Sequence, residues 1–177
     1  MRMNTNSVKM LVSAIFAFVF LLAAPAFAQT PLKLCLWAPD RQWPADGDVS
    51  GLRLAIYGSS QNITGADIYV VGKTEGDFLG AAFNFAYGSY KGNMAGAAFG
   101  LVSSVEKKAC GFLAGLYSEA QSMTGVQFGL VNKTTFLNGL QFGFVNFASA
   151  GNGVQIGFVN FFDGAKYPLL PIVNAKF

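Results

Sequence analysis

A short repeat runs through most of the chain and restricts its fold more than any other feature. Three segments near the C-terminus share the pattern Gly-x-Gln-x-Gly-hydrophobic-Val-Asn and begin at Gly125, Gly139 and Gly153. Weaker copies begin at five earlier glycines, Gly51, Gly65, Gly80, Gly96 and Gly111. Successive starting points are separated by fourteen to sixteen positions. Each unit is too short to enclose a core alone, so the spacing predicts an architecture in which neighbouring units stack.

Each unit predicts one β-strand. Its second, fourth and sixth positions are apolar in every copy, whereas the positions between them are small, polar or mixed. This period of two favours a strand with one buried face, and we expect the apolar face to point into the core. Representative apolar residues are Leu52, Leu54, Ile56, Ala81, Phe83, Phe85, Val126, Phe128, Leu130, Leu140, Phe142 and Phe144. A further apolar residue precedes the next glycine by two positions and is expected to pack from an opposite wall; examples are Ile63, Phe78, Met94, Met123 and Leu137.

Two all-β architectures use about eight units of this kind. One is a β-solenoid, in which each unit forms one coil, and the other is an up-and-down barrel of antiparallel strands. The solenoid is favoured because the repeat contains one strand, whereas antiparallel strands reverse direction and repeat in pairs. Three apolar positions also span only roughly 14 Å at 3.4 Å per residue, while an outer-membrane barrel needs a band of about 25 Å. The barrel stays the alternative because the chain ends on an aromatic residue, Phe177.

Parallel stacking predicts two ladders of side-chain amides, in which each amide bonds to its equivalent in the next unit. One ladder consists of the asparagines at the eighth position, Asn132, Asn146 and Asn160. The other consists of the glutamines at the third position, Gln127, Gln141 and Gln155. Both ladders are expected to be structural.

The segment at 1–28 has the order of a secretory signal peptide. Arg2 and Lys9 precede an apolar run at 11–24, and Ala26-Phe27-Ala28 supplies small residues for a cleavage site. The run is shorter than the roughly 20 residues that span a bilayer, so we expect cleavage and export. The rest of the chain is divided into an entry strand and loop at 29–50, a β-repeat domain at 51–166 and a closing segment at 167–177.

Composition restricts the chemistry. The chain contains no histidine, the side chain that most often serves as general base or metal ligand. Removal of Arg2 and Lys9 with the leader lowers the formal charge from +3 to +1, which removes the electrostatic reason to expect a nucleic-acid partner. Asp46-Gly47-Asp48 resembles the first half of a calcium loop, but Tyr57 stands where that loop needs a glutamate. We therefore predict no catalytic residue, cofactor or metal site, and no enzymatic activity.

The two cysteines, Cys35 and Cys110, are compatible with two oxidation states. Outside the cytoplasm they can form a disulfide, and the alternative is a pair of thiols. Their positions in the sequence do not choose between these states.

The leader, the serial Gly-x-Gln-x-Gly-hydrophobic-Val-Asn units and the closing segment at 169–177 resemble the bacterial surface repeat-containing proteins of the leptospiral type. The resemblance covers about residues 32–177. It is specific in the last three units, whereas the units from Gly51 to Gly96 match by spacing alone. The resemblance implies a secreted or envelope-associated protein of uncharacterised activity, and it carries no catalytic or binding residue.

These features predict an exported, non-enzymatic protein of the periplasm, outer membrane or cell surface that serves as a structural or interaction surface. Self-association, or docking to an envelope partner, is expected through an outer face of small and apolar residues. That face consists of Gly100, Gly115, Gly129, Gly143, Gly157, Val102, Val131, Val145 and Val159. Membrane association stays open. The alternative function is that of a small outer-membrane β-barrel with a role in transport or membrane integrity.

Overall fold

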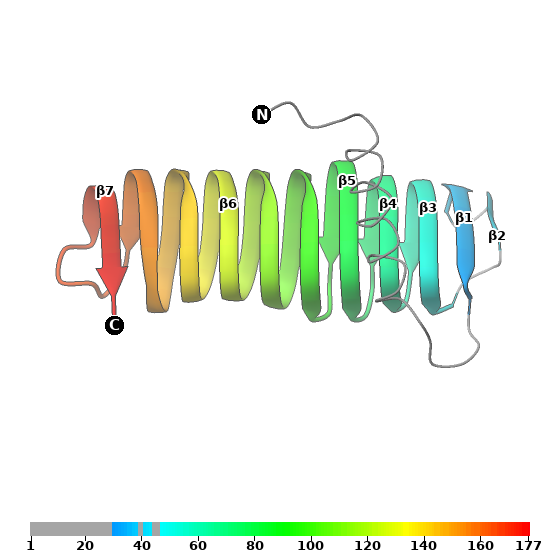
Figure 1. The fold of residues 1–177 in the computed structure, drawn as a ribbon, viewed down its shortest axis with the longest axis horizontal. Helices are drawn as coiled ribbons and strands as arrows, with labels where there is room; N and C mark the ends of the chain where they lie inside the picture. The colour runs from blue at the N-terminus through cyan, green and yellow to red at the C-terminus, as the bar shows by residue number, and fades with distance from the viewer. Residues whose placement is uncertain (1–29, 39–40, 44–46) are drawn as a thin grey trace, which may run out of the picture.

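The computed structural model describes residues 30–38, 41–43 and 47–177. The predicted signal peptide at 1–28 and Asp46 lie outside the described residues. The described chain forms a single sheet with the strand order β2-β1-β3-β4-β5-β6-β7, and this sheet winds into an elongated coil (Figure 1). The strands are β1 (Leu32–Trp37), β2 (Arg41–Trp43), β3 (Val49–Ser60), β4 (Ile63–Thr74), β5 (Phe78–Tyr90), β6 (Met94–Phe162) and β7 (Leu169–Lys176).

The repeat strands pair in parallel and in register. β1 pairs with β3, β3 with β4, β4 with β5 and β5 with β6. Gly65 lies opposite Gly51 on one side and opposite Gly80 on the other, so equivalent positions of successive units stack. This arrangement confirms the β-solenoid and excludes the up-and-down barrel, whose neighbouring strands are antiparallel.

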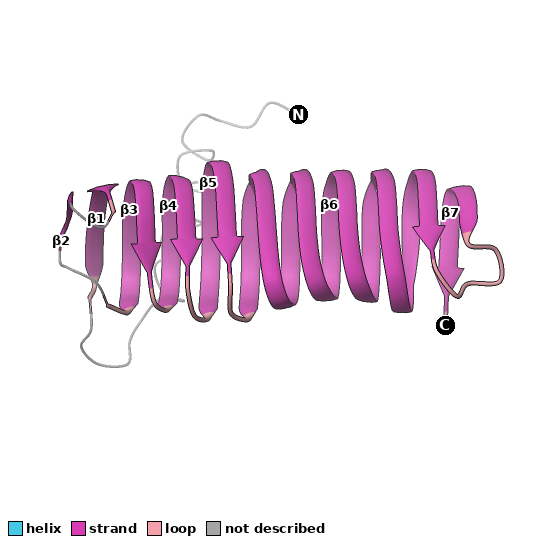
Figure 2. Cartoon of the chain, turned by 180° about the vertical axis from the view of Figure 1, so that it is seen from behind, coloured by secondary structure: helices cyan, strands magenta, loops and turns pink. Residues whose placement is uncertain are grey.

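About four turns of the solenoid consist of separate strands, fewer than the eight repeat units predicted. The reason is that β6 continues through 69 residues without a break. Figure 2 shows loops between β3, β4, β5 and the start of β6, and an uninterrupted strand through the later coils. The repeat glycines explain how those coils stay close. Gly125 has a φ of +127°, and a Cβ placed there would collide with the carbonyl oxygen of Gly111. Any other residue would therefore push the two coils apart.

The interior is lined by the opposite strand face from the one predicted. Gln127 is fully buried, whereas the adjacent Phe128 is 51% exposed and Phe142 is 44% exposed. The prediction that the second, fourth and sixth positions form the core is therefore wrong. The stacked coils bring the side chains of the other face close enough to hydrogen-bond along the axis, so polar groups are stable inside. The misplaced residues are partly or largely solvent-exposed: Leu52, Leu54, Ile56, Ala81, Phe83, Phe85, Val126, Phe128, Leu130, Leu140, Phe142 and Phe144.

The apolar core comes mainly from two other positions of the unit. The residue two positions before each repeat glycine is at most 1% exposed in the examples named above, Ile63, Phe78, Met94, Met123 and Leu137. The tenth position, which a register shift moves to the eleventh in the unit from Gly80, adds the buried side chains of Tyr90, Val105, Ala120, Ala148 and Phe162. These residues form one continuous buried cluster along the coil.

Antiparallel strands lie at the two ends of the winding. At one end β2 pairs with β1, with Trp43 opposite Leu34. At the other end β7 pairs with the last coil of β6, with Val173 opposite Ile156. The side-chain Nδ2 of Asn174 donates to the carbonyl oxygens of Asn160 and Tyr167, which fixes β7 over the last coil. These strands give both ends a pairing different from that between repeat coils (Figure 1).

Candidate functional site

The three repeat asparagines lie in one buried column. Asn132 donates from Nδ2 to Oδ1 of Asn146 at 2.9 Å, and Asn146 donates from Nδ2 to Oδ1 of Asn160 at 2.8 Å. The amides of Asn132 and Asn146 also donate to the carbonyl oxygens of Phe142 and Ile156 in the next coil. The asparagine column therefore joins three consecutive coils through both side chain and backbone.

The three repeat glutamines form a second column that runs in the opposite direction. Gln141 donates from Nε2 to Oε1 of Gln127 at 2.7 Å, and Gln155 donates from Nε2 to Oε1 of Gln141 at 2.8 Å. All six amide residues are fully buried. Because their polar atoms face other coils and not solvent, the two columns hold the fold together and offer no site to a ligand.

Glycine at the fifth position of a unit leaves room inside the coil for the asparagine at the eighth position. A Cβ on Gly143 would lie 2.5 Å from Nδ2 of Asn132 and 3.1 Å from Oδ1 of Asn146. In an earlier unit the sizes are reversed, because Tyr69 fills the interior and a Cβ on Gly72 would collide with its ring. Each unit has a glycine at one of these positions, with Gly88 displaced to the ninth position by a register shift: Ala55–Gly58, Tyr69–Gly72, Asn84–Gly88, Gly100–Ser103, Gly115–Ser118, Gly129–Asn132, Gly143–Asn146 and Gly157–Asn160.

The residues of the predicted glycine and valine face are all partly exposed, but its glycines lie on the side of the strand that faces the interior. Its glycines border the buried asparagine amides, as the surroundings of Gly129, Gly143 and Gly157 show. Its valines Val102, Val131, Val145 and Val159 are only partly exposed. The exchange between the fifth and eighth positions was visible in the sequence, but its meaning required knowledge of which strand face is inside.

The first coils carry a buried ion pair that the sequence analysis did not single out. Arg53 donates from Nε and Nη2 to the two carboxylate oxygens of Asp67, at 2.8 and 2.7 Å, and both side chains are fully buried. Arg53 Nη1 also donates to Oγ of Ser60 and to the carbonyl oxygen of Lys73. Burial raises the pKa of Asp67, and the Arg53 guanidinium opposes that rise. Both residues occupy the third position of their units, where later units have glutamine. This equivalence of position is the sequence signal that could have identified the pair.

A buried tyrosine pair lies in the same region. The hydroxyl oxygens of Tyr69 and Tyr90 are 2.6 Å apart. Burial raises the pKa of both hydroxyls above the ordinary value of tyrosine. The two hydroxyls are therefore neutral partners in a hydrogen bond and have no exposed position from which to act on a substrate.

Two straight columns of apolar side chains cover one outer side of the coil, and we call them together the apolar face. Strand partners Leu54, Ile68, Phe83 and Phe99 show that these side chains stack from coil to coil. The fourth-position column contains Leu34, Leu54, Ile68, Phe83, Phe99, Ala114, Phe128, Phe142 and Ile156. The sixth-position column contains Ile56, Val70, Phe85, Leu101, Leu116, Leu130, Phe144 and Phe158. With the exception of the partly buried Ala114 and Ile156, these side chains are exposed.

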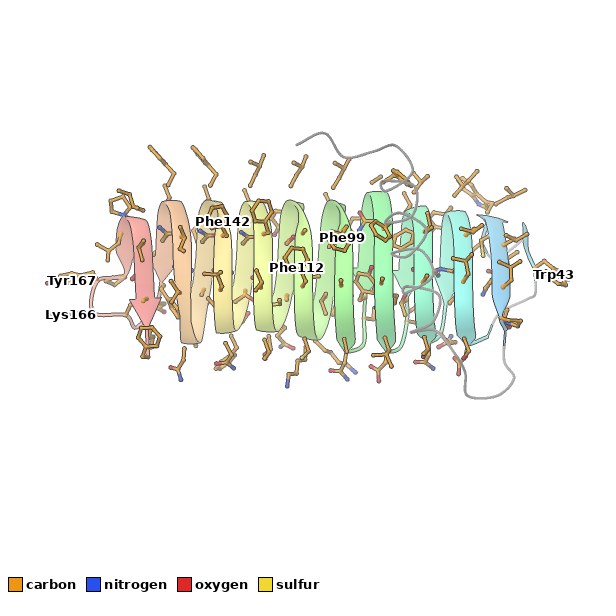
Figure 3. The ribbon with its side chains drawn as sticks, viewed as in Figure 1. Trp43, Phe99, Phe112, Phe142, Lys166 and Tyr167 are labelled. Atoms are coloured by element: carbon orange, nitrogen blue, oxygen red, sulfur yellow. The ribbon has the colours of Figure 1, made fainter. Side chains whose placement is uncertain are left out.

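Aromatic stacking orders the apolar face along the axis. The ring centroids of Phe128 and Phe142 are 5.4 Å apart with an interplanar angle of 2°, and those of Phe144 and Phe158 are 5.0 Å apart with an angle of 5°. Figure 3 shows Phe99 and Phe142 on the same side of the ribbon, with Trp43 at the β2 end. At that end the face forms an open apolar groove, whose lining includes Leu34, Leu36, Trp43, Leu54, Ile56 and Ile68.

The charged groups of the described residues lie outside these two columns. Glu75 binds both Lys73 and Lys91, at 2.6 and 2.8 Å, and Glu119 binds Lys133 at 2.8 Å. The lysine partners lower the pKa of both glutamates. Lys107 and Lys108 are also exposed, and neither lies in the two columns.

The acidic and thiol groups of the described residues do not gather into a metal centre. Within ranges 30–38, 41–43 and 47–177, no group of three or more His, Cys, Asp or Glu side chains is placed to hold a metal ion. Cys35 is buried and Cys110 is exposed, and both are thiols. The described part of the chain also has no helix with the length and apolar character needed to cross a membrane.

The fold and the apolar face define a class of protein: a β-solenoid with amide ladders inside and stacked aromatic residues outside. Comparisons with protein-family models, curated proteins and solved structures found no match to this chain. The function therefore rests on the geometry and chemistry of the apolar face.

Proposed function

We propose that the protein is an exported, non-enzymatic structural protein of the bacterial cell envelope and that the apolar face is its interaction surface. The leader-like segment at 1–28 and the resemblance to bacterial surface repeat proteins support export. The hydrogen bonds of the buried polar groups support a structural role, because Arg53 and Asp67 satisfy each other inside the coil. The alternative role in transport depended on the barrel fold and is dropped.

The observation that carries this proposal is the size of the apolar face. Its seven phenylalanines are between 37% and 68% exposed. At about 200 Å² for a phenylalanine side chain and an average exposure of about one half, they present roughly 700 Å². The largest apolar patch on a typical soluble monomer is about 300 to 600 Å², and larger patches mark interaction sites. The aliphatic members of the two columns enlarge the surface further.

Cell fractionation tests the proposal. The full chain with its leader is expressed in a Gram-negative host, together with a face variant carrying Phe128→Ser, Phe142→Ser and Phe144→Ser. The control carries Lys107→Ser, Gln121→Ser and Phe136→Ser, three substitutions at exposed positions outside the face. Intact cells are treated with a chemical crosslinker before fractionation. We expect all three proteins to be exported, and the native chain and the control to be crosslinked to a partner, whether a second copy or another envelope component, whereas the face variant is not. Retention of the native chain in the cytoplasm, or equal crosslinking of all three proteins, would overturn the proposal.

A further inference from the structure

We propose that the partner of the apolar face is a second copy of this chain, packed face to face in a two-fold dimer. This inference rests on the proposed function, because it names the occupant of the same surface. It is carried by three properties of the face: its area, its lack of charge and its regular shape.

The area of the face matches what a stable dimer needs. The phenylalanines alone present roughly 700 Å² on each copy, or roughly 1,400 Å² for two copies. Specific protein interfaces bury about 1,200 to 2,000 Å² in total. Because aromatic side chains dominate the face, the buried area would also be rich in the residue type that contributes most to interface energy.

The charge pattern favours a second copy over an anionic lipid surface. Neither column of the described face contains a charged residue. The flanking second position is also apolar, from Leu52 through Phe112 to Val154. Proteins that lie on anionic membranes usually border their apolar surface with lysine and arginine. Here Lys73, Lys91 and Lys133 are paired with glutamates, and the exposed Lys107 and Lys108 lie outside the two columns and their flanking second position. An uncharged face is best matched by another uncharged face, and a second copy supplies one.

The shape of the face is complementary to itself. The fourth and sixth positions are two residues apart, so the two columns are separated by roughly 7 Å. Each column is a ridge and the space between the columns is a furrow. A ridge of one copy can enter the furrow of another, as in face-to-face packed sheets about 10 Å apart and in steric zippers. The parallel stacks Phe128–Phe142 and Phe144–Phe158 keep the ridges straight across the last three units, whereas the smaller Ala114 lowers the fourth-position ridge in an earlier unit.

Two-fold symmetry closes the assembly at two copies. Each chain would contribute the same face, and the contact would use up the apolar face of both. The antiparallel strands β2 and β7 lie at the ends of the sheet, where end-to-end addition of further coils would otherwise occur. The structure therefore points to a discrete dimer and not to a fibre.

Analytical ultracentrifugation of the exported protein over a concentration series tests the inference. The first variant combines Phe142→Ser with Phe144→Ser, near the β7 end of the face. The matched control combines Phe136→Ser with Phe147→Ser, two exposed phenylalanines outside the two columns. We expect a native dimer, a dissociation constant at least tenfold weaker in the face variant, and no comparable change in the control. Phe85→Ser combined with Phe158→Ser, at face positions that are 66% and 68% exposed, provides a second face variant, and circular dichroism verifies that each protein is folded.

Vesicle flotation separates the failure of this inference from the failure of the proposed function. Neutral phosphatidylcholine vesicles and anionic phosphatidylglycerol vesicles are mixed with the same proteins. A native monomer that floats through the face would overturn the dimer and leave the interaction surface intact, with lipid as its occupant. A native monomer that neither dimerises nor floats would overturn both. Equal dissociation constants for the face variants and the control would also overturn the dimer.

Discussion

At the scale of single residues, the interior contains amide side chains whose hydrogen bonds are satisfied only when the equivalent amides of both neighbouring coils are present. Asn146 accepts from Asn132 and donates to Asn160, so its position in the middle of the column satisfies it on both sides. The amides at the ends of the columns have unsatisfied atoms. Oδ1 of Asn132 and Nε2 of Gln127 are buried without a hydrogen-bond partner among the described residues. A buried polar group without a partner costs about 1 to 3 kcal/mol, so the middle of each ladder contributes more than its ends.

Replacement of Asn146 by leucine tests the ladder. The change removes the acceptor used by Asn132 and the donor used by Asn160, and we expect a loss of about 1 to 3 kcal/mol in the free energy of unfolding. Lys133→Ala is the control, because Lys133 is exposed and its ion pair with Glu119 is solvated. Urea denaturation should give a lower midpoint for Asn146→Leu and a nearly native midpoint for Lys133→Ala. Equal, near-native midpoints would show that the amide column is not stabilising.

The residue pattern predicted the amide columns correctly and predicted the wrong buried face. The amide columns follow from the constant spacing of the last three units, since parallel stacking places equivalent residues together whichever face is inside. Alternation defines two faces but does not say which one encloses the interior. Hydrophobicity favoured Phe128 over Gln127 as the buried residue, and the structure places them the other way round. The deciding factor is hydrogen bonding between coils, which no single unit reveals.

At the scale of one coil on the next, the third-position column changes its chemistry along the axis. Lys33, Arg53 and Asp67 are consecutive partners in the first coils, whereas Gln127, Gln141 and Gln155 fill the same position in the last ones. Both solutions satisfy buried polar groups by contact with the neighbouring coil. The repeat could not predict the antiparallel strands β2 and β7, because β2 precedes the first repeat unit and β7 follows the last one.

The Arg53–Asp67 pair provides a test of this equivalence. Asp67→Asn removes the charge opposite a buried guanidinium, and we expect a loss of about 3 to 5 kcal/mol in the free energy of unfolding. The double variant Arg53→Gln, Asp67→Gln replaces the ion pair with the amide pair of the later coils, and it should recover at least half of that loss. Glu119→Gln, which weakens an exposed ion pair, is the control and should have little effect. The equivalence is wrong if chemical denaturation finds the double variant as unstable as Asp67→Asn.

At the scale of the whole molecule, parallel winding accounts for both the amide ladders and the apolar face. Units that stack in register place amides in columns inside and phenylalanines in columns outside. The same winding makes the face long and straight, which is the basis of the proposed interaction surface. Both the amide columns and the proposed interaction surface therefore require that successive units advance along one axis.

Distances between spin labels measure that advance most directly. In a Cys35→Ala, Cys110→Ser background, one label is attached at Lys73 and the other at Lys133 or at Phe161. These are equivalent ninth positions of units four and six steps apart, so at about 4.8 Å per step the separations should be roughly 19 and 29 Å. Double electron–electron resonance should therefore give a second distance roughly 10 Å longer than the first. A second distance equal to or shorter than the first, as in a closed ring of strands, would contradict the solenoid.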